Sequence, residues 1–187
     1  MSGTIFDTGD SMHPSARATK EGANKEKEFK DLVLLRGNVP CIKYSEFENS
    51  KTSLTMELST GLPSIQDKIL VKGIPYNSVY EGSKCRTEYG FYSYLPPIKA
   101  DEPPVVDYSA RIEIKKMDHP GSADEKLGYI LLNAQLGRFP ENELIIICIG
   151  PGFREGAFDF IPDYASKFIK MPVIVFRDME EAIDYII

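Results

Sequence analysis

Apolar residues recur at helical spacing near the start of the chain. The pattern predicts a helix from residue 16 to residue 36 whose apolar stripe consists of Phe29, Leu32, Val33 and Leu35. Residues 1–14 ahead of this helix mix Gly, Ser, Asp, Thr and Pro without any period. We therefore expect a flexible N-terminal arm followed by a helix with one buried stripe.

The pattern then becomes typical of strands. Residues 68–74 and 77–82 predict two short extended segments separated by Pro75. Residues 86–95 are rich in Tyr and Phe and predict a longer strand, and residues 106–117 predict another. A Pro-rich stretch between the two long strands predicts a loop or a long hairpin tip, so we expect these strands to pair in antiparallel fashion.

Two continuous apolar runs follow, at residues 143–149 and 171–176, of the kind found in strands that are covered on both faces. Ser122 with Glu125 three residues later forms a capping box, which predicts the start of a helix ahead of the first run. Helical patterns follow both runs. The order of elements predicts an α/β fold with a central mixed sheet flanked by helices, arranged as one domain over residues 15–187.

Composition limits the classes of function. The chain has 187 residues, which suits one substantial core. Its net charge of −6 argues against sequence-blind coating of nucleic acid, although a local basic groove is compatible with an acidic remainder. No apolar run approaches the roughly 20 residues that cross a bilayer, and no secretory signal is evident, so we expect a cytoplasmic protein without a membrane partner.

The candidate chemistry lies on the two long strands. Glu113 and Lys115 are two residues apart, so their side chains point to one face of the strand while Ile114 points into the core. Glu88 on the preceding strand can lie across from them. Two converging carboxylates repel each other, and a divalent cation such as Mg²⁺ relieves that repulsion. Lys115 can then hold and help deprotonate a water that attacks phosphorus. An E-x-K triplet alone is also common on solvated strands.

Three short motifs follow one another within residues 79–187. They read Arg86-Thr-Glu88-Tyr89, Ile112-Glu113-Ile114-Lys115, and Gly121-Ser122-Ala-Asp-Glu125-Lys126 with Tyr129. With the strand, glycine turn and strand–helix that come after them, these motifs resemble the PD-(D/E)XK nuclease superfamily, and more narrowly its restriction-endonuclease-like branch. The resemblance implies a restriction-endonuclease-like α/β/α core.

The resemblance also implies roles for individual residues. It makes Glu88, Glu113 and Ile114 the positions that hold a metal, and Lys115 the catalytic lysine. Lys126, near the start of the following helix, would lie close to the scissile phosphate and belong to the catalytic set together with the two glutamates.

Three further residues would support such a site. Glu125 would lie beside Lys126, and Arg86 would hold a phosphate or pair with Glu88. Glu28 fits a helical glutamate that commonly approaches the metal in this superfamily, but it fits equally well as a solvated residue in a charge-rich run. The sequence departs from the branch after the catalytic lysine, where an aromatic residue and Gln are frequent and this chain has Lys116 and Met117.

The function implied is that of a Mg²⁺-dependent DNA endonuclease of the restriction type or from a phage or mobile element, with Mn²⁺ able to replace Mg²⁺. Such a core cuts one strand per site, so a duplex cutter of this size would be expected to act as a homodimer. The alternative is a catalytically weak or inactive nuclease-like scaffold that binds nucleic acid or a protein partner. The acidic charge fits the scaffold slightly better, and an intact set of two acids and a lysine fits it worse.

Overall fold

The computed structural model describes residues 14–49, 68–80, 82–95, 105–119 and 123–187, and their side chains except those of 14–19 and 123–126. The elements are α1 (Pro14–Gly37), β1 (Cys41–Lys43), β2 (Lys68–Asn77), β3 (Lys84–Leu95), β4 (Val105–Lys116), α3 (Ala123–Gln135), β5 (Glu143–Ile149), α4 (Glu155–Phe168), β6 (Val173–Phe176) and α5 (Met179–Ile186). Within this described part, no helix is both long and apolar enough to span a bilayer.

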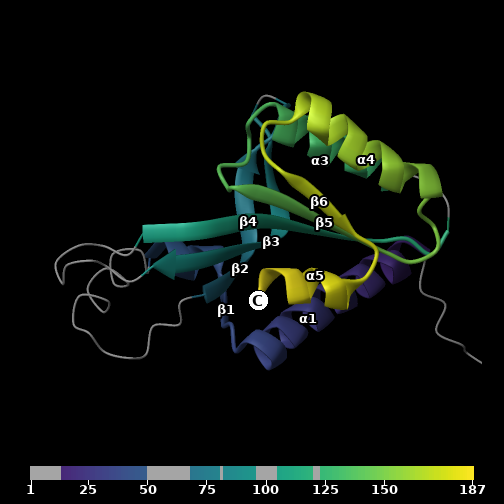
Figure 1. The fold of residues 1–187 in the computed structure, drawn as a ribbon. Coiled ribbons are helices and arrows are strands. Elements are labelled where there is room, and N and C mark those ends of the chain that lie inside the picture. The colour runs from purple at the N-terminus through teal and green to yellow at the C-terminus, as the bar shows by residue number, and fades with distance from the viewer. Residues whose placement is uncertain (1–13, 50–67, 81, 96–104, 120–122) are drawn as a thin grey trace, which may run out of the picture.

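Six strands form one sheet in the order β1-β2-β3-β4-β5-β6. The helices α1 and α5 cover one face of it, and α3 and α4 cover the other (Figure 1). This arrangement confirms the predicted α/β fold with a central mixed sheet flanked by helices. The expected N-terminal arm, the Pro-rich loop and the Ser122–Glu125 capping box fall outside the described residues or side chains.

The sheet is mixed because its connections differ in length. β2, β3 and β4 pair in antiparallel fashion, as strands joined by hairpin-like connections do. β4, β5 and β6 are parallel to one another, and the helices α3 and α4 provide the crossovers that parallel neighbours require.

One sequence-based expectation about β2 was wrong. We expected two extended segments separated by Pro75, but a single strand runs through this proline to Asn77, and residues 78–80, 82 and 83 lie in the connection to β3. Among the described residues, β1 pairs with residues 70–72 alone. In this part of the chain Pro75 therefore has no strand beside it on that side, which is where a residue without an N–H is tolerated inside a strand.

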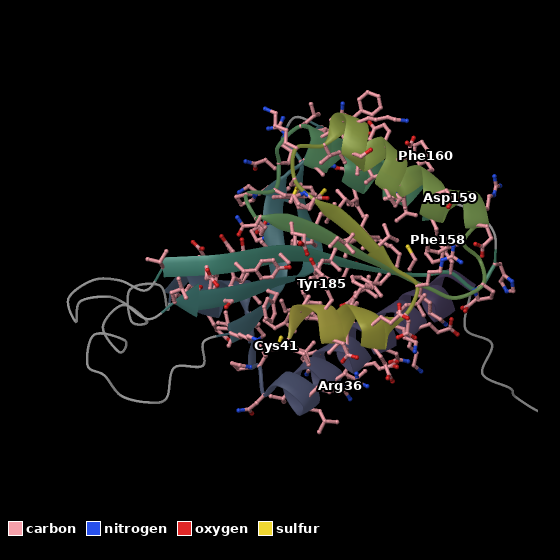
Figure 2. The ribbon with its side chains drawn as sticks, viewed as in Figure 1. Arg36, Cys41, Phe158, Asp159, Phe160 and Tyr185 are labelled. Atoms are coloured by element: carbon pink, nitrogen blue, oxygen red, sulfur yellow. The ribbon has the colours of Figure 1, made fainter. Side chains whose placement is uncertain are left out.

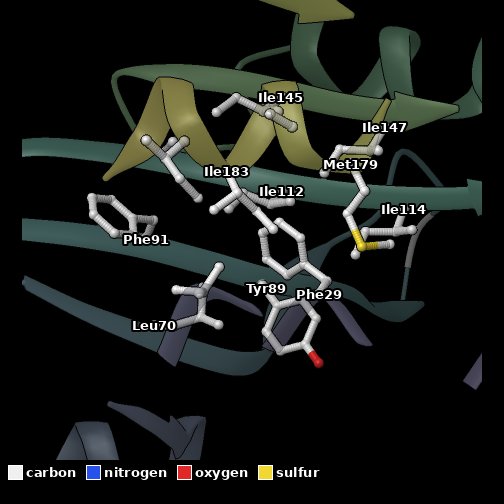
Figure 3. Packing of buried hydrophobic residues seen from close by; sticks show 14 of the residues in the cluster. Phe29, Leu70, Tyr89, Phe91, Ile112, Ile114, Ile145, Ile147, Met179 and Ile183 are labelled. Atoms are coloured by element: carbon white, nitrogen blue, oxygen red, sulfur yellow. The ribbon is translucent and has the colours of Figure 1, made fainter. Parts of the chain in front are cut away.

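The first hydrophobic core lies between the sheet and the pair α1 and α5. Phe29 of α1 packs against Tyr89 of β3, with ring centroids 5.4 Å apart, and Ile183 of α5 belongs to the same buried cluster (Figure 3). Phe29 and Val33 of the predicted stripe are buried here, whereas Leu35 is 80% exposed, so its assignment to the buried stripe was wrong. A second core, on the other face, packs the sheet against α3 and α4.

β5 contributes to both cores, as its continuous apolar run predicts. Ile145 and Ile147 point into the core under α1 and α5, whereas Leu144, Ile146 and Cys148 point into the core under α3 and α4. Because β5 is parallel to β4 and directly beside it, this fully buried strand gives β4 a rigid neighbour along the segment that carries the candidate chemistry.

The end of β4 is fixed by the turn between β5 and α4. Gly150 has a φ of 104°, and a Cβ there would lie 2.2 Å from the carbonyl oxygen of Met117. The amide of Gly152 donates to the same carbonyl at 2.9 Å. The Gly-Pro-Gly sequence is therefore a tight strand-to-helix turn that packs its backbone against the chain just after Lys116.

Helix α5 is attached to its surroundings by polar contacts. Arg36 at the end of α1 donates to Asp184 at 2.9 Å and to Glu180 at 2.7 Å (Figure 2). Tyr185 donates to the buried carboxylate of Glu143 at 3.0 Å, and Tyr108 donates to its other oxygen at 2.7 Å. These contacts connect α5 to α1 and to the start of β5.

A buried ion pair lies on the sheet face that α3 and α4 cover. Arg111 of β4 makes two hydrogen bonds of 2.7 Å to Glu141, and both side chains are at most 2% exposed. Tyr92 donates to Glu141 at 3.0 Å, and Arg111 also donates to Thr87 at 3.2 Å. The guanidinium carbon lies 4.8 Å from the centre of the Phe139 ring. This network joins β3 and β4 to the loop that precedes β5.

We expect Arg111→Met to lower the free energy of unfolding by about 3–5 kcal/mol, because it leaves the carboxylate of Glu141 buried without its cation. Urea denaturation followed by circular dichroism measures this loss. The matched control is Lys167→Ala, which breaks the exposed pair with Asp163 and should cost less than about 0.5 kcal/mol. Equal losses in the two variants would show that the buried pair does not hold the sheet together.

Candidate active site

Glu88 and Glu113 face each other where β3 and β4 separate. The antiparallel register pairs Tyr89 with Ile112, and the two glutamates are one residue beyond this pair on the opposite face of the strands. The carboxylate of Glu88 accepts a hydrogen bond from the backbone N–H of Ile114 at 3.3 Å. One acid therefore lies against the backbone of the strand that carries the other.

Lys115 brings the two carboxylates together. Its ammonium group lies 2.9 Å from an oxygen of Glu88 and also forms an ion pair with Glu113. All three side chains are largely buried, with 18% of Lys115, 16% of Glu88 and 7% of Glu113 exposed. The structure thus assembles the acid–acid–lysine set that the sequence predicts.

The two glutamates have opposite shifts in pKa. Burial, the hydrogen bond to Glu88 and the negative charge of Glu88 raise the pKa of Glu113 well above its usual value. Burial also acts to raise the pKa of Glu88, but the hydrogen bond to Glu113 and the charge of Lys115 outweigh it, so this pKa is lowered. Glu113 therefore retains a proton to higher pH than an ordinary glutamate does.

Lys115 is an ammonium ion in this arrangement. Burial acts to lower its pKa, but the charges of Glu113 and Glu88 and their hydrogen bonds outweigh burial, so the pKa is raised. While Glu113 holds its proton, one carboxylate, one carboxylic acid and one ammonium together carry no net charge. This neutrality allows three ionisable groups to be buried beside one another.

The donor set fits a divalent cation. In the described part of the chain no group of three or more His, Cys, Asp or Glu side chains is placed to hold a metal ion, so the site offers two carboxylates. Mg²⁺ is commonly held by one or two carboxylates and completes its coordination with waters and substrate phosphate. One oxygen of Glu113 is buried without any hydrogen-bond partner, which is unusual for a buried carboxylate and leaves it free to bind a cation. Ile114 could contribute only its backbone.

The set opens into a surface pocket of about 410 Å³. Glu113 and Lys115 line it together with Arg86 of β3 and Tyr129 of α3, and Tyr76, Cys85 and Ile130 complete its walls. The hydroxyl of Tyr129 is hydrogen-bonded to Ser78 at 2.5 Å. Substrate can therefore approach the two acids from the α3 side of the sheet.

Of the other predicted site residues, Arg86 is the one whose side chain the structure places near the pocket. Arg86 is exposed at the pocket wall, and among the described contacts the carboxylate of Glu88 is paired with Lys115 and not with Arg86. The side chains of Glu125 and Lys126 lie outside those the structure describes.

Glu28 is not brought to the site. It lies on α1, which packs on the opposite face of the sheet from Glu113, and its carboxylate pairs with Lys25 at 2.6 Å on the exposed side of the helix. The charge-rich run to which it belongs is a solvated helix face, which was the alternative that the sequence left open.

Sequence reasoning did not assign Tyr76 or Tyr129 to the pocket. Tyr129 is part of the third motif, and its spacing from Lys126 would place it one turn further along the same helix. That spacing was the available signal. For Tyr76 no local signal exists, because its place in the wall depends on the pairing of β2 with β3.

Comparison with known families finds a match for the C-terminal part of the chain. The family model of a PD-(D/E)XK nuclease superfamily domain matches residues 102–184. The match covers a little under half of the chain. The matched segment contains Glu113 and Lys115, whereas Glu88 precedes it and joins the site through the pairing of β3 with β4. No curated protein and no solved structure matches the chain.

The site predicts a pH-dependent response to Mg²⁺. Binding of a cation by both carboxylates requires Glu113 to lose its proton, so affinity should rise with pH through the range between the usual glutamate pKa and the raised one. A free Mg²⁺ concentration about a hundredfold above Kd stabilises the folded state by about 2.7 kcal/mol. Thermal unfolding with and without Mg²⁺ at several pH values measures this gain.

The variant Glu113→Gln serves as the control for this experiment, since it keeps the size of the side chain and removes the titrating group. We expect it to lose the stabilisation by Mg²⁺ at every pH. A gain in stability that persists in Glu113→Gln, or one that falls as pH rises, would place the cation elsewhere.

Proposed function

We propose that this protein is a metal-dependent DNA endonuclease that hydrolyses phosphodiester bonds, with Mg²⁺ as its cofactor and Mn²⁺ as a substitute. The observation that carries the proposal is the convergence of Glu88, Glu113 and Lys115, with Glu113 and Lys115 lining a pocket and lying in the segment that matches a nuclease superfamily domain. A site of this kind has no evident structural purpose, because burying three ionisable groups costs free energy that apolar residues would not.

Each residue has a distinct part in the proposed reaction. Glu88 and Glu113 hold the cation, and Lys115 donates hydrogen bonds to the attacking water and to a phosphate oxygen. When bound, the cation neutralises charge that develops on the phosphate oxygens during in-line attack. Because both acids keep Lys115 protonated, its role here is to hold and orient the water while charged. Arg86 at the pocket wall is suited to a neighbouring phosphate, and Lys126 is assigned to the scissile phosphate by its motif alone.

The proposal extends to the oligomeric state and the cellular compartment. A duplex cutter with one such site per chain would act as a homodimer, so that two sites cut the two strands. The three cysteines are all free thiols, which suits the reducing cytoplasm.

The test is cleavage of supercoiled plasmid, linear duplex and single-stranded DNA with Mg²⁺ or with EDTA. We expect cutting only with the metal, and a loss of about 10²–10³-fold in both Lys115→Ala and Glu113→Gln, the range typical of removing one group that stabilises charge in the transition state. Lys116→Ala is the matched control: Lys116 is adjacent in sequence but pairs with Glu21 of α1 and with Asp118.

Wild-type activity in Lys116→Ala, beside the losses in the other two variants, would assign cutting to the proposed site. If the folded wild-type protein cuts no form of DNA with Mg²⁺ or Mn²⁺, the endonuclease proposal is wrong. The alternative of a nuclease-like scaffold would then replace it.

A further inference from the structure

The turn between β2 and β3 lies beside α3 (Figure 1). The backbone N–H of Val79 donates to Asn133 at 3.1 Å, and Asn133 is fully buried and donates in turn to the carbonyl of Tyr129 at 2.8 Å. Within the turn, the backbone N–H of Ser78 donates to the carbonyl of Ser83 at 3.0 Å. The turn is therefore a rigid part of the molecule.

This rigid turn presents an exposed aromatic ring. Tyr80 is 65% exposed, although its amide donates to Ser78 at 2.9 Å. Its ring stacks on Tyr129, with centroids 5.6 Å apart and planes 14° from parallel. Tyr129 thus covers one face of the Tyr80 ring and contributes its own ring edge to the active-site pocket. The other face of Tyr80 remains available to a flat partner.

Two cationic side chains line a pocket that this same turn helps to form. The pocket, of about 440 Å³, is lined by residues of the turn and by Lys84 and Arg138, neither of which has an ion-pair partner among the described residues. This pocket adjoins the active-site pocket, because Ser78 in the first and Cys85 in the second both contact the hydroxyl of Tyr129. In a nucleic acid a flat base is attached to a negatively charged backbone. The base can stack on an aromatic ring while the phosphate lies against a cationic side chain.

The rest of the molecule limits the kind of nucleic acid that fits. A chain of net charge −6 cannot neutralise many phosphates, and only a few cations gather here. A base can stack on Tyr80 only if it is not already stacked within a duplex. Single-stranded DNA meets both conditions, since aromatic stacking supplies much of its binding free energy and few phosphate contacts are needed.

We propose that Tyr80, Lys84 and Arg138 form a docking surface for a single-stranded DNA segment adjoining the phosphate at the active site. The base stacks on Tyr80, and its phosphates lie against Lys84 and Arg138. This inference deepens the proposed function, on which it rests for the position of the scissile phosphate, but the docking surface itself is tested by binding alone.

The experiment measures binding of dye-labelled single-stranded oligonucleotide and of blunt duplex by fluorescence anisotropy, in EDTA so that nothing is cut. We expect the single strand to bind more tightly, Tyr80→Ala to weaken it by about tenfold, and Tyr80→Phe to retain it, because a phenyl ring stacks as well. The double variant Lys84→Ala with Arg138→Ala should reduce the slope of log Kd against log salt concentration by about 1.4, because each phosphate contact to a single strand contributes about 0.7.

Two variants elsewhere serve as controls. Phe160→Ala removes another exposed aromatic ring, on α4, and Lys27→Ala removes an exposed cation on α1. Both should bind as the wild type does. Equal binding of duplex and single strand, or a Tyr80→Ala protein that binds as tightly as wild type, would overturn the docking surface.

Failure of this proposal and failure of the nuclease proposal are distinguishable. If the protein cuts DNA and Tyr80→Ala changes neither the affinity for DNA nor KM, the nuclease proposal stands and the docking surface is wrong. If Tyr80→Ala weakens binding but the wild-type protein cuts no DNA, the docking surface stands and the nuclease proposal is wrong.

Discussion

The contact between Lys115 and the two glutamates is the interaction on which the site depends. Glu88 and Glu113 could not be buried side by side on a sheet face without a cation, because two carboxylates at this separation repel. The ammonium of Lys115 and the proton retained by Glu113 together balance the charge. The same requirement explains why the arrangement suits a divalent cation, which would replace the proton and turn both carboxylates towards itself.

The sheet around this contact is built to keep it in place. β3 and β4 separate at the two glutamates, and the amide of Ile114 donates to Glu88 at this point. Two residues back along β4, Arg111 forms the second buried ion pair, with Glu141. On the far side of β4, β5 is buried on both faces. The candidate chemistry therefore lies on a strand with little freedom to move, as a preorganised site requires.

Part of the site could be predicted from the sequence, because strand alternation is a local property. The features that depend on tertiary packing could not. Strand alternation places Glu113 and Lys115 on one face whatever the tertiary structure, and the apolar run of β5 can only be a buried strand or helix segment. Which face of the sheet α1 covers is not a local property, so the sequence could not decide between a metal-proximal and a solvated Glu28. Tyr80 meets Tyr129 across 49 positions of sequence, and no spacing rule links them.

The most direct test of the account is a crystal structure of the protein soaked with Mn²⁺, recorded with anomalous scattering. The account predicts an anomalous peak between the carboxylates of Glu88 and Glu113, and no peak at that position in Glu113→Gln crystals treated in the same way. A site without a peak, with Lys115 still paired to both acids in the presence of Mn²⁺, would contradict the claim that these residues form a metal-dependent active site.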